Sequence, residues 1–365
     1  MASSPPPLAK STRPKIGGSR IVILTEGKTD PLTAKTANVM LRCRGDDVVA
    51  VLDSTQAGKT AEELLGVGGD TPIVASLDDV ALIDGKGPDT LLIGVATAGG
   101  KIPPEWRALC LDAVRRGMSV VSGMHQFLSD DAELVAAAAA AGVQLHDVRK
   151  NNEKEVATRL DLTDDCLRVL TVGQDCSVGK MLSALEIARG LERSGVDAKF
   201  VATGQTGIMV EGDGLPIDCV VSDFVNGACE KLVRQNLSHE VMVVEGQATI
   251  THPRFSAVSL GLLHGTNPHA MIYVYEAGRD AMRGMEYLPL PTHRQVIDAY
   301  EHMAAFGNPA KVIGIAMNSR KLSAEAAEVE RERMRAEFGL PVADPIRHGP
   351  DELVEAILAY KKSRN

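Results

Sequence analysis

Residues 170–183 read LTVGQDCSVGKMLS, and this stretch decides the fold of the second half of the chain. An apolar run ends at Gly173, five residues separate it from Gly179, and Lys180 opens a segment with helical character. A strand that leads through such a loop into a helix points backbone N–H groups and the positive end of the helix dipole at one place. The usual phosphate loop has four residues between its glycines and Ser or Thr after the lysine. Met181 stands there instead, so the sequence predicts a phosphate site of a variant kind.

The bulk composition is that of a globular enzyme with one or two domains, since the chain has 365 residues. A net charge of −9 argues against nucleic acid as a partner, because no excess of cations is present to neutralise phosphates. The six cysteines show no CxxC spacing, which is typical of a reduced, cytoplasmic protein. No apolar run reaches the length of a membrane span. We expect a homodimer, because symmetric dimers are the commonest oligomers.

The first part of the chain alternates short apolar runs with amphipathic or Ala-rich segments. This alternation predicts βαβ units and a parallel sheet. The runs are residues 20–24, 48–52, 72–75, 91–95 and 119–122. We therefore predict a Rossmann-like N-terminal domain of about five strands over residues 19–150. Residues 1–18, which are rich in Pro, Ser and Lys, are predicted to form a flexible tail.

The alternation resumes after a predicted linker at residues 151–160. The apolar runs of this second part are residues 168–172, 198–202, 241–244, 270–275 and 312–316, and the predicted helices include 294–305, 324–338 and 350–361. Residues 161–365 therefore form a second α/β domain with a parallel sheet around the phosphate loop. The fold class is α/β with two domains.

A carboxylate follows one of the later strands of the second domain. The segment VMVVEGQ, residues 241–247, ends its apolar run at Glu245, and such an acid beside a phosphate loop can hold a metal or a proton. The GxDxxVGK loop with this EG dipeptide resembles the dethiobiotin-synthetase-like branch of phosphate-loop proteins. That resemblance implies that Asp175 and Lys180 contact phosphate or metal. A ligand that carries a diphosphate without Mg²⁺, such as coenzyme A, tolerates Met181.

Longer blocks give a closer resemblance. They are GQDCSVGKM, ATGQTGI, DFVNGACE, VEGQATITHPRFSAVSLGLLHG and GLPVADPIRHG in the second domain, and KTAN, AVLDSTQAGKT, IGVATAGG and VSGMHQFLSDD in the first. Together they resemble the D-glutamate N-acetyltransferase family, with a Rossmann-like N-terminal and a phosphate-loop C-terminal domain. The resemblance implies transfer of the acetyl group of acetyl-CoA to the amine of D-glutamate, in D-amino-acid catabolism. No metal is implied. The residues expected to bind the coenzyme are Gly173, Asp175, Cys176, Ser177, Val178, Gly179, Lys180 and Met181.

Amide formation from a thioester requires a base, an oxyanion site and groups that hold the acceptor. The candidate bases are Glu245, His252 and Asp223, each predicted to lie at the carboxyl edge of the second sheet. Backbone N–H groups of residues 204–207 or of Gly246 are candidate oxyanion donors. The predicted substrate-binding residues are Arg42, Arg149, Arg254, Gln205, Thr206 and Gln247. Cys176 either accepts the acetyl group or lends only its backbone N–H.

Two other functions fit the same motifs. The first is an ATP-dependent ligase or kinase like dethiobiotin synthetase, which would need Mg²⁺. The second is a non-catalytic sensor of a nucleotide or coenzyme. Likeness of fold alone is weak evidence for either function.

Overall fold

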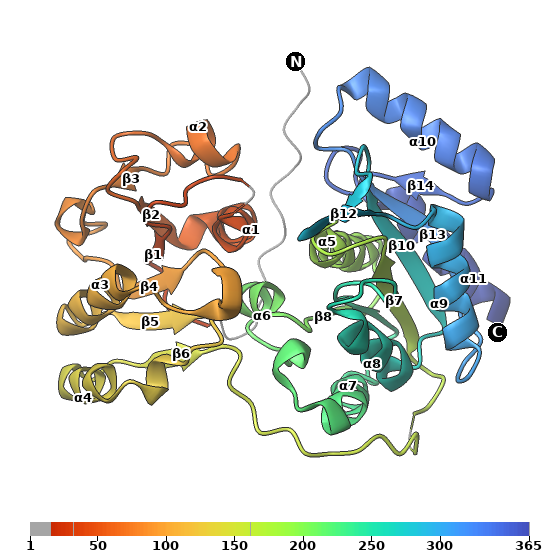
Figure 1. The fold of residues 1–365 in the computed structure, drawn as a ribbon, viewed down its shortest axis with the longest axis horizontal. Helices are drawn as coiled ribbons and strands as arrows, with labels where there is room; N and C mark the ends of the chain where they lie inside the picture. Colours follow the sequence, from red (N-terminus) through yellow and green to blue (C-terminus); the bar gives the residue numbers. More distant parts are fainter. Residues whose placement is uncertain (1–15, 32, 161, 365) are drawn as a thin grey trace. The chain divides into compact units, whose positions relative to one another are not determined.

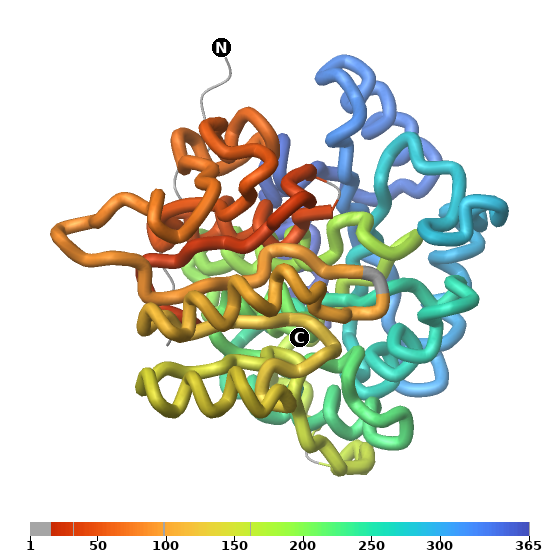
Figure 2. Tube along the Cα trace, turned by 60° about the vertical axis from the view of Figure 1, so that its left-hand side comes forward, coloured from red at the N-terminus to blue at the C-terminus, as the bar shows by residue number. Residues whose placement is uncertain are grey.

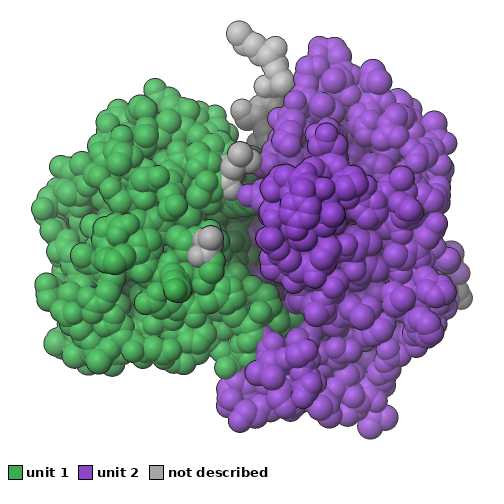
Figure 3. Space-filling view, viewed as in Figure 1, with its two compact units in different colours: residues 1–151, 205–219 green, residues 152–204, 220–365 purple. Residues whose placement is uncertain are grey.

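The computed structural model describes residues 16–31, 33–160 and 162–364, so residues 1–15 of the predicted tail lie outside the described part. The chain forms two compact units (Figure 3): residues 1–151 with 205–219 make the first unit, and residues 152–204 with 220–365 make the second. The sequence analysis assigned residues 205–219 to the second domain, whereas in the structure this segment packs with the first unit.

The first unit contains a parallel sheet with the strand order β3-β2-β1-β4-β5-β6 (Figure 1). Its strands in the described residues are β1 Ile21–Leu24, β2 Val48–Leu52, β3 Ile73–Val74, β4 Thr90–Ile93, β5 Ser119–Ser122 and β6 Leu145–Asp147. All five predicted apolar runs form strands, and β6 is a sixth strand beyond the five expected. This is the order of the doubly wound Rossmann sheet, so the prediction of a Rossmann-like domain is confirmed.

The helices of the first unit are α1 Lys35–Arg44, α2 Ala61–Leu65, α3 Pro104–Arg115, α4 Ala132–Ala141 and α6 Gln205–Glu211. Helix α4 begins after Asp131, whose carboxylate accepts the N–H groups of Glu133 and Leu134 and so caps the helix. Helices α3 and α4 lie side by side (Figure 2). Helix α6 packs on α1, where the buried Arg44 donates to the carbonyl of Met209 at 3.1 Å.

The second unit is built on a parallel sheet with the order β14-β13-β10-β7-β9-β8. Its strands are β7 Leu167–Gly173, β8 Ala198–Val201, β9 Val241–Val244, β10 Ala270–Glu276, β13 Lys311–Asn318 and β14 Val342–Ala343, and a separate antiparallel pair joins β11 Ala281–Met282 to β12 Met285–Pro289. Every residue of β7, β9 and β10 is buried, which explains their continuous apolar runs.

The helices of the second unit are α5 Lys180–Arg193, α7 Val225–Arg234, α8 Ser256–Thr266, α9 His293–Ala304, α10 Ala324–Phe338 and α11 Asp351–Arg364. Right-handed crossovers place α5 on one face of the sheet and α7 to α10 on the other. Helix α11 packs beside α5, and α8 packs against both α7 and α9. Among residues 16–31, 33–160 and 162–364, no helix combines the length and apolar character needed to cross a bilayer.

The strand order of the second sheet reverses at β7. The chain first adds β8 and β9 on one side of β7 and then crosses to β10 on the other side. In open α/β sheets such a reversal leaves a crevice beyond the carboxyl ends of the strands, and ligands bind there. The phosphate loop follows β7 at this point, so the topology itself places the candidate site.

Candidate functional site

The phosphate loop runs from Gly173 to the first turn of α5. Gly179 has φ of +113°, a conformation that favours glycine, and a Cβ atom on Gly173 would lie 2.9 Å from the Lys180 amine. The turn therefore favours glycine at position 179, and the Lys180 side chain leaves no room for a larger residue at position 173. No side chain in the described residues caps the N-terminus of α5. The loop thus presents an uncapped helix end, which is the requirement for an anion site.

Lys180 is buried inside this loop. Its ammonium donates to the carbonyl of Asp175 at 2.8 Å, and 6% of the residue is exposed. Burial lowers the pKa of Lys180 to about 8, and the nearby Cys176 and Asp175 only partly oppose this shift. A lysine with this pKa carries its charge near neutral pH and would be stabilised by an arriving anion.

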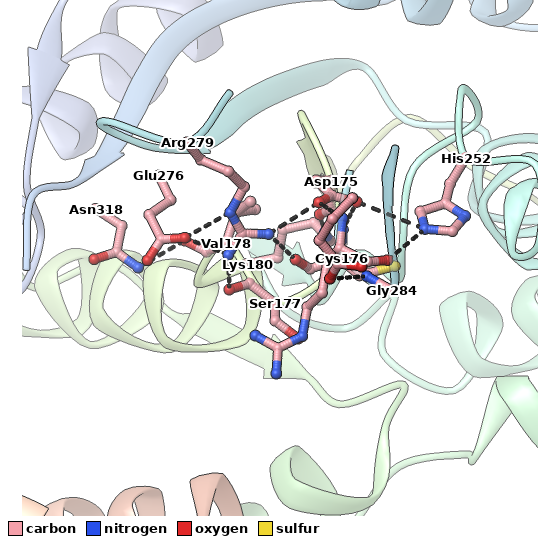
Figure 4. Close-up of polar contacts among 12 residues, drawn as sticks. Asp175, Cys176, Ser177, Val178, Lys180, His252, Glu276, Arg279, Gly284 and Asn318 are labelled. Carbon is pink, nitrogen blue, oxygen red and sulfur yellow. Dashed lines mark hydrogen bonds and ion pairs between the residues drawn. The ribbon is translucent and has the colours of Figure 1, made fainter. Parts of the chain in front are cut away.

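Asp175 is held within the loop by three N–H donors. Its Oδ1 accepts the backbone N–H of Cys176 at 2.7 Å, and its Oδ2 accepts from Arg279 Nη1 at 3.0 Å and from the Arg283 N–H at 2.8 Å (Figure 4). The side chain is fully buried. Asp175 therefore shapes the loop in this structure, and the contact with phosphate or metal that the resemblance implied stays a prediction.

Arg279 joins the loop to the end of strand β10. Besides Asp175 it donates to the carbonyls of Cys176 at 2.7 Å and Ser177 at 3.2 Å, and its Nε donates to Glu276 at 2.6 Å (Figure 4). The neighbouring Asn318, at the end of β13, donates to the carbonyl of Val178 at 3.0 Å. One guanidinium thus fixes both a buried acid and the loop backbone.

The sequence analysis missed Arg279 and Glu276. Glu276 could have been predicted from the sequence. It is the last residue of the buried strand β10, and Glu245 likewise directly follows the buried strand β9. Burial raises the pKa of Glu276, but the charges of Arg279 and Arg320 outweigh that effect and hold this pKa below its usual value. Arg279 itself lies in an irregular segment between β10 and β11, where no periodicity marks it.

We expect Arg279→Met to lower the free energy of unfolding by about 3–5 kcal/mol, because it removes the arginine that pairs with the buried Asp175 and one of the cations that pair with the buried Glu276. Urea unfolding measures the loss. Arg320→Met is the matched control, since Arg320 pairs with the same Glu276 but its side chain is 37% exposed. That change should cost about 1 kcal/mol or less. Equal losses in the two variants would contradict the role given to Arg279.

Glu245 lies at the end of β9, beside the loop. Its Oε2 accepts the N–H groups of Thr203 at 3.0 Å and Gly204 at 3.2 Å, and its charge contributes to the electrostatic environment of Lys180. The N–H of Gly246 donates to Thr171 Oγ1 at 2.9 Å. The N–H groups of Gly204 and Gly246 are therefore engaged within the protein, which makes them poor candidates for the oxyanion site.

His252 is fully buried next to the loop. Its Nδ1 accepts the N–H of Arg254 at 3.1 Å, so Nε2 carries the proton and donates to the carbonyl of Arg283 at 3.2 Å. Nε2 lies 3.8 Å from Asp175 Oδ1. Because both ring nitrogens are engaged, this geometry favours a positioning role for His252 over that of general base.

The remaining predicted residues fall into two groups. In the second unit, Gln247 donates to Thr203 Oγ1 at 3.1 Å, Met181 is half-buried, and Asp223 and Arg254 are exposed. The other four belong to the first unit. There Gln205 and Thr206 bond Thr36 at 3.3 and 3.1 Å, and Arg149 pairs with Asp218 at 2.9 Å. The buried Nε of Arg42 has no hydrogen-bond partner within the described residues. The second unit thus gathers the loop, Glu245, Gln247 and His252 around one sheet edge.

Comparison with known proteins agrees with this architecture. Residues 54–151 match the N-terminal Rossmann-like domain, and residues 154–354 match the C-terminal P-loop domain, of a domain family of unknown function, DUF1611. This chain belongs to the DUF1611 family. A DUF1611 family protein of known crystal structure, from Anabaena variabilis, is 35% identical, with a TM-score of 0.88 over 94% of this chain and 100% of that one.

Two curated relatives carry a functional name. The D-glutamate N-acetyltransferase of Tritonibacter scottomollicae is 38% identical over 287 residues, which are 78% of this chain and 86% of that protein. A protein of the same name from Pseudoalteromonas is 36% identical over 269 residues, 73% of this chain and 81% of that one. The resemblance stated from the sequence is therefore confirmed at the level of the DUF1611 family and of these named relatives.

Proposed function

We propose that the protein transfers the acetyl group of acetyl-CoA to the amine of D-glutamate. The observation that carries this proposal is the 38% identity, over most of both chains, to a D-glutamate N-acetyltransferase. The phosphate loop supports it, because the uncapped end of α5 and the buried Lys180 suit the diphosphate of coenzyme A. Met181 supplies no hydroxyl for Mg²⁺, which a diphosphate bound without metal does not need.

The reaction exchanges one bond for another. The neutral amine nitrogen attacks the thioester carbonyl, a C–N bond forms, the C–S bond breaks, and the coenzyme leaves as a thiol. The ammonium must first lose a proton, and Glu245 is our candidate acceptor because it lies beside the loop on the neighbouring strand end. His252 would orient the loop through Asp175 and Arg283 rather than take that proton.

An ATP- and Mg²⁺-dependent ligase or kinase is the second candidate. The observation that favours it is the position of Glu245 next to the lysine of the loop, where phosphate-loop enzymes place an acid on the metal side. The cluster of Asp175, Cys176 and His252 does not suit Mg²⁺, because Mg²⁺ prefers oxygen ligands and the Asp175 carboxylate already accepts three N–H groups.

A paired assay separates the candidates. Thiol release from acetyl-CoA is followed with and without D-glutamate, and phosphate release from Mg-ATP is followed in parallel. We expect thiol release that requires D-glutamate and no turnover of ATP. ATP turnover without thiol release would overturn the proposal. Binding of either ligand without any turnover would identify a sensor.

Coenzyme binding should depend on pH through Lys180. The pKa of this lysine in the free protein is about 8, so its charged fraction, which binds phosphate, falls as the pH rises through that value. Between pH 7 and 9 we expect the Kd for coenzyme A to rise by about tenfold, because the protonated fraction of Lys180 falls by about that factor over this range. Calorimetric titration measures this change. Lys180→Met should show a flat profile over the same range, and a flat profile in the wild type would contradict the assignment.

A further inference from the structure

The first unit holds a cluster of three different metal-ligand types that the reaction described above does not use. His125, Asp218 and Cys219 offer an imidazole nitrogen, a carboxylate oxygen and a thiol sulfur, and these atoms all lie within 4.8 Å of one another. His125 follows strand β5, whereas the other two residues belong to the 3₁₀ turn Ile217–Cys219. All three residues are part of the first unit, although 94 positions separate His125 from Cys219.

The separation of two of these donors matches a metal site. His125 Nδ1 lies 3.3 Å from Cys219 Sγ. Two ligands of a tetrahedral Zn²⁺ ion, bound at about 2.0 Å through nitrogen and about 2.3 Å through sulfur, lie about 3.5 Å apart. The same spacing also suits a weak S–H···N hydrogen bond. The third donor distinguishes the two, because a hydrogen-bonded pair needs no carboxylate beside it.

Asp218 supplies this third donor and keeps an oxygen available for it. Arg149 donates to one carboxylate oxygen, Oδ2, through Nε at 3.0 Å and Nη2 at 2.9 Å. No group among the described residues donates a hydrogen bond to the other oxygen, Oδ1, and the residue is exposed. Rotation of the carboxylate can therefore bring Oδ1 to a metal while Oδ2 stays on Arg149. Metal-ligating carboxylates are commonly held by a second hydrogen-bond partner in this way.

Hydrogen bonds from two side chains hold the ligand-bearing segments together. Arg149 donates through Nη1 to the carbonyl of Gly123, two residues before His125. The same arginine thus bridges the loop after β5 and the 3₁₀ turn, because its other donors reach that turn. Asn151 donates to the carbonyl of Cys219 at 3.1 Å. Such pre-organisation lowers the entropy cost of gathering the ligands around an ion.

Close packing fixes the histidine ring. Gly100 has φ of +63°, and a Cβ atom there would lie 2.5 Å from Cδ2 of His125. The N–H of Gln126 donates to the carbonyl of Gly100 at 3.0 Å, which holds the two loops in register. A residue larger than glycine would displace the ring. Gly100 therefore lets Nδ1 of His125 face the thiol of Cys219.

We propose that His125, Asp218 and Cys219 bind a zinc ion, with water as the fourth ligand. The set mixes imidazole, carboxylate and thiolate, which suits Zn²⁺ or Co²⁺ and not Mg²⁺, because Mg²⁺ requires oxygen ligands. On binding, the Cys219 thiol releases its proton to solvent and an S–Zn bond replaces the S–H bond. The thiolate and the carboxylate then balance the two charges of the ion. The ion would tie residues 205–219, which come from the second half of the chain, to the loop after β5.

Metal uptake tests the site with matched controls. Full-length protein freed of metal with EDTA is dialysed against Zn²⁺, and bound metal is counted. We expect one ion per chain with a Kd of about 1 µM or lower. Cys219→Ser and His125→Gln should each weaken uptake by about 100-fold or more, because each removes a ligand. Cys43→Ser and His146→Gln should leave it unchanged, since both residues are half-buried in the first unit and lie outside the cluster.

Cobalt shows which atoms bind the ion. Co²⁺ in place of Zn²⁺ should give a near-ultraviolet charge-transfer band from the thiolate and the visible bands of a tetrahedral site. The charge-transfer band should vanish in Cys219→Ser and remain in Cys43→Ser. It should also remain in Cys176→Ser, whose sulfur belongs to the separate cluster of the phosphate loop.

Hydrogen exchange shows what the ion holds. Zn²⁺ should slow the exchange of the amides of residues 205–219 in the wild type and in Cys43→Ser, with no change in Cys219→Ser. Exchange that stays the same when the metal binds would contradict the tie between this segment and the loop after β5.

Three results would overturn the site itself. They are no uptake of Zn²⁺ by the wild type, equal uptake by the wild type and Cys219→Ser, and loss of the cobalt charge-transfer band in Cys176→Ser rather than in Cys219→Ser. The last result would place the ion at the phosphate loop. None of these measurements involves acetyl transfer, so the metal site and the proposed function are tested separately.

Discussion

Lys180→Met should weaken acetyl-CoA binding by about 100-fold, because it removes a buried, charged hydrogen-bond donor from the anion site. The effect should appear in the KM for acetyl-CoA and in the calorimetric Kd, with little change in the KM for D-glutamate. Folding should tolerate the change. The buried ammonium already bears the desolvation penalty that lowers its pKa to about 8, so an apolar side chain of similar length removes that penalty.

The control for this variant is Lys311→Met. Lys311 is in the same unit, its side chain is 66% exposed, and it pairs with Glu301 at 2.6 Å. An exposed ion pair of this kind contributes little, so coenzyme affinity should stay within about twofold of the wild type. If both Lys180→Met and Lys311→Met bind the coenzyme as tightly as the wild type does, the loop does not bind the coenzyme. The proposed function then loses its structural support.

Gly246→Ala should lower the free energy of unfolding of the second unit by more than about 4 kcal/mol or prevent its folding, since overpacking against backbone cannot relax. A Cβ atom at Gly246 would lie 1.7 Å from the carbonyl oxygen of Thr171 on the neighbouring strand β7. The glycine of the EG dipeptide is therefore explained by close packing of two strand ends. The same close packing places Glu245, the acid that precedes this glycine, near the loop lysine Lys180.

Far-UV circular dichroism during urea unfolding measures this loss. The single tryptophan of the chain, Trp106, is buried in the first unit, so its fluorescence reports a different part of the protein in the same experiment. Gly45→Ala is the control, because Gly45 has φ of −53° and nothing lies within 4 Å of an added Cβ. Wild-type stability in Gly246→Ala would show that the strand ends are farther apart than the structure places them.

Much of the candidate site follows from local sequence. The loop between Gly173 and Lys180 and the acid at Glu245 were both read from short patterns, because each pattern needs only a strand end and a few adjacent residues. The residues that form hydrogen bonds and ion pairs with them could not be predicted from the sequence. His252 was proposed as a base from its polar neighbours, yet only the fold shows that both of its ring nitrogens are engaged.

The sequence by itself determined the two α/β domains, the phosphate loop and the DUF1611 family, because buried parallel strands and glycine-rich turns leave patterns within a few residues. The tertiary structure alone decided that Arg279 clamps Asp175, a contact between residues 104 positions apart. It also decided that residues 205–219 pack with the first unit and that Cys219 lies beside His125. These features depend on contacts between irregular segments that are far apart in the sequence. Such segments have no helical or strand periodicity from which the contacts could be predicted.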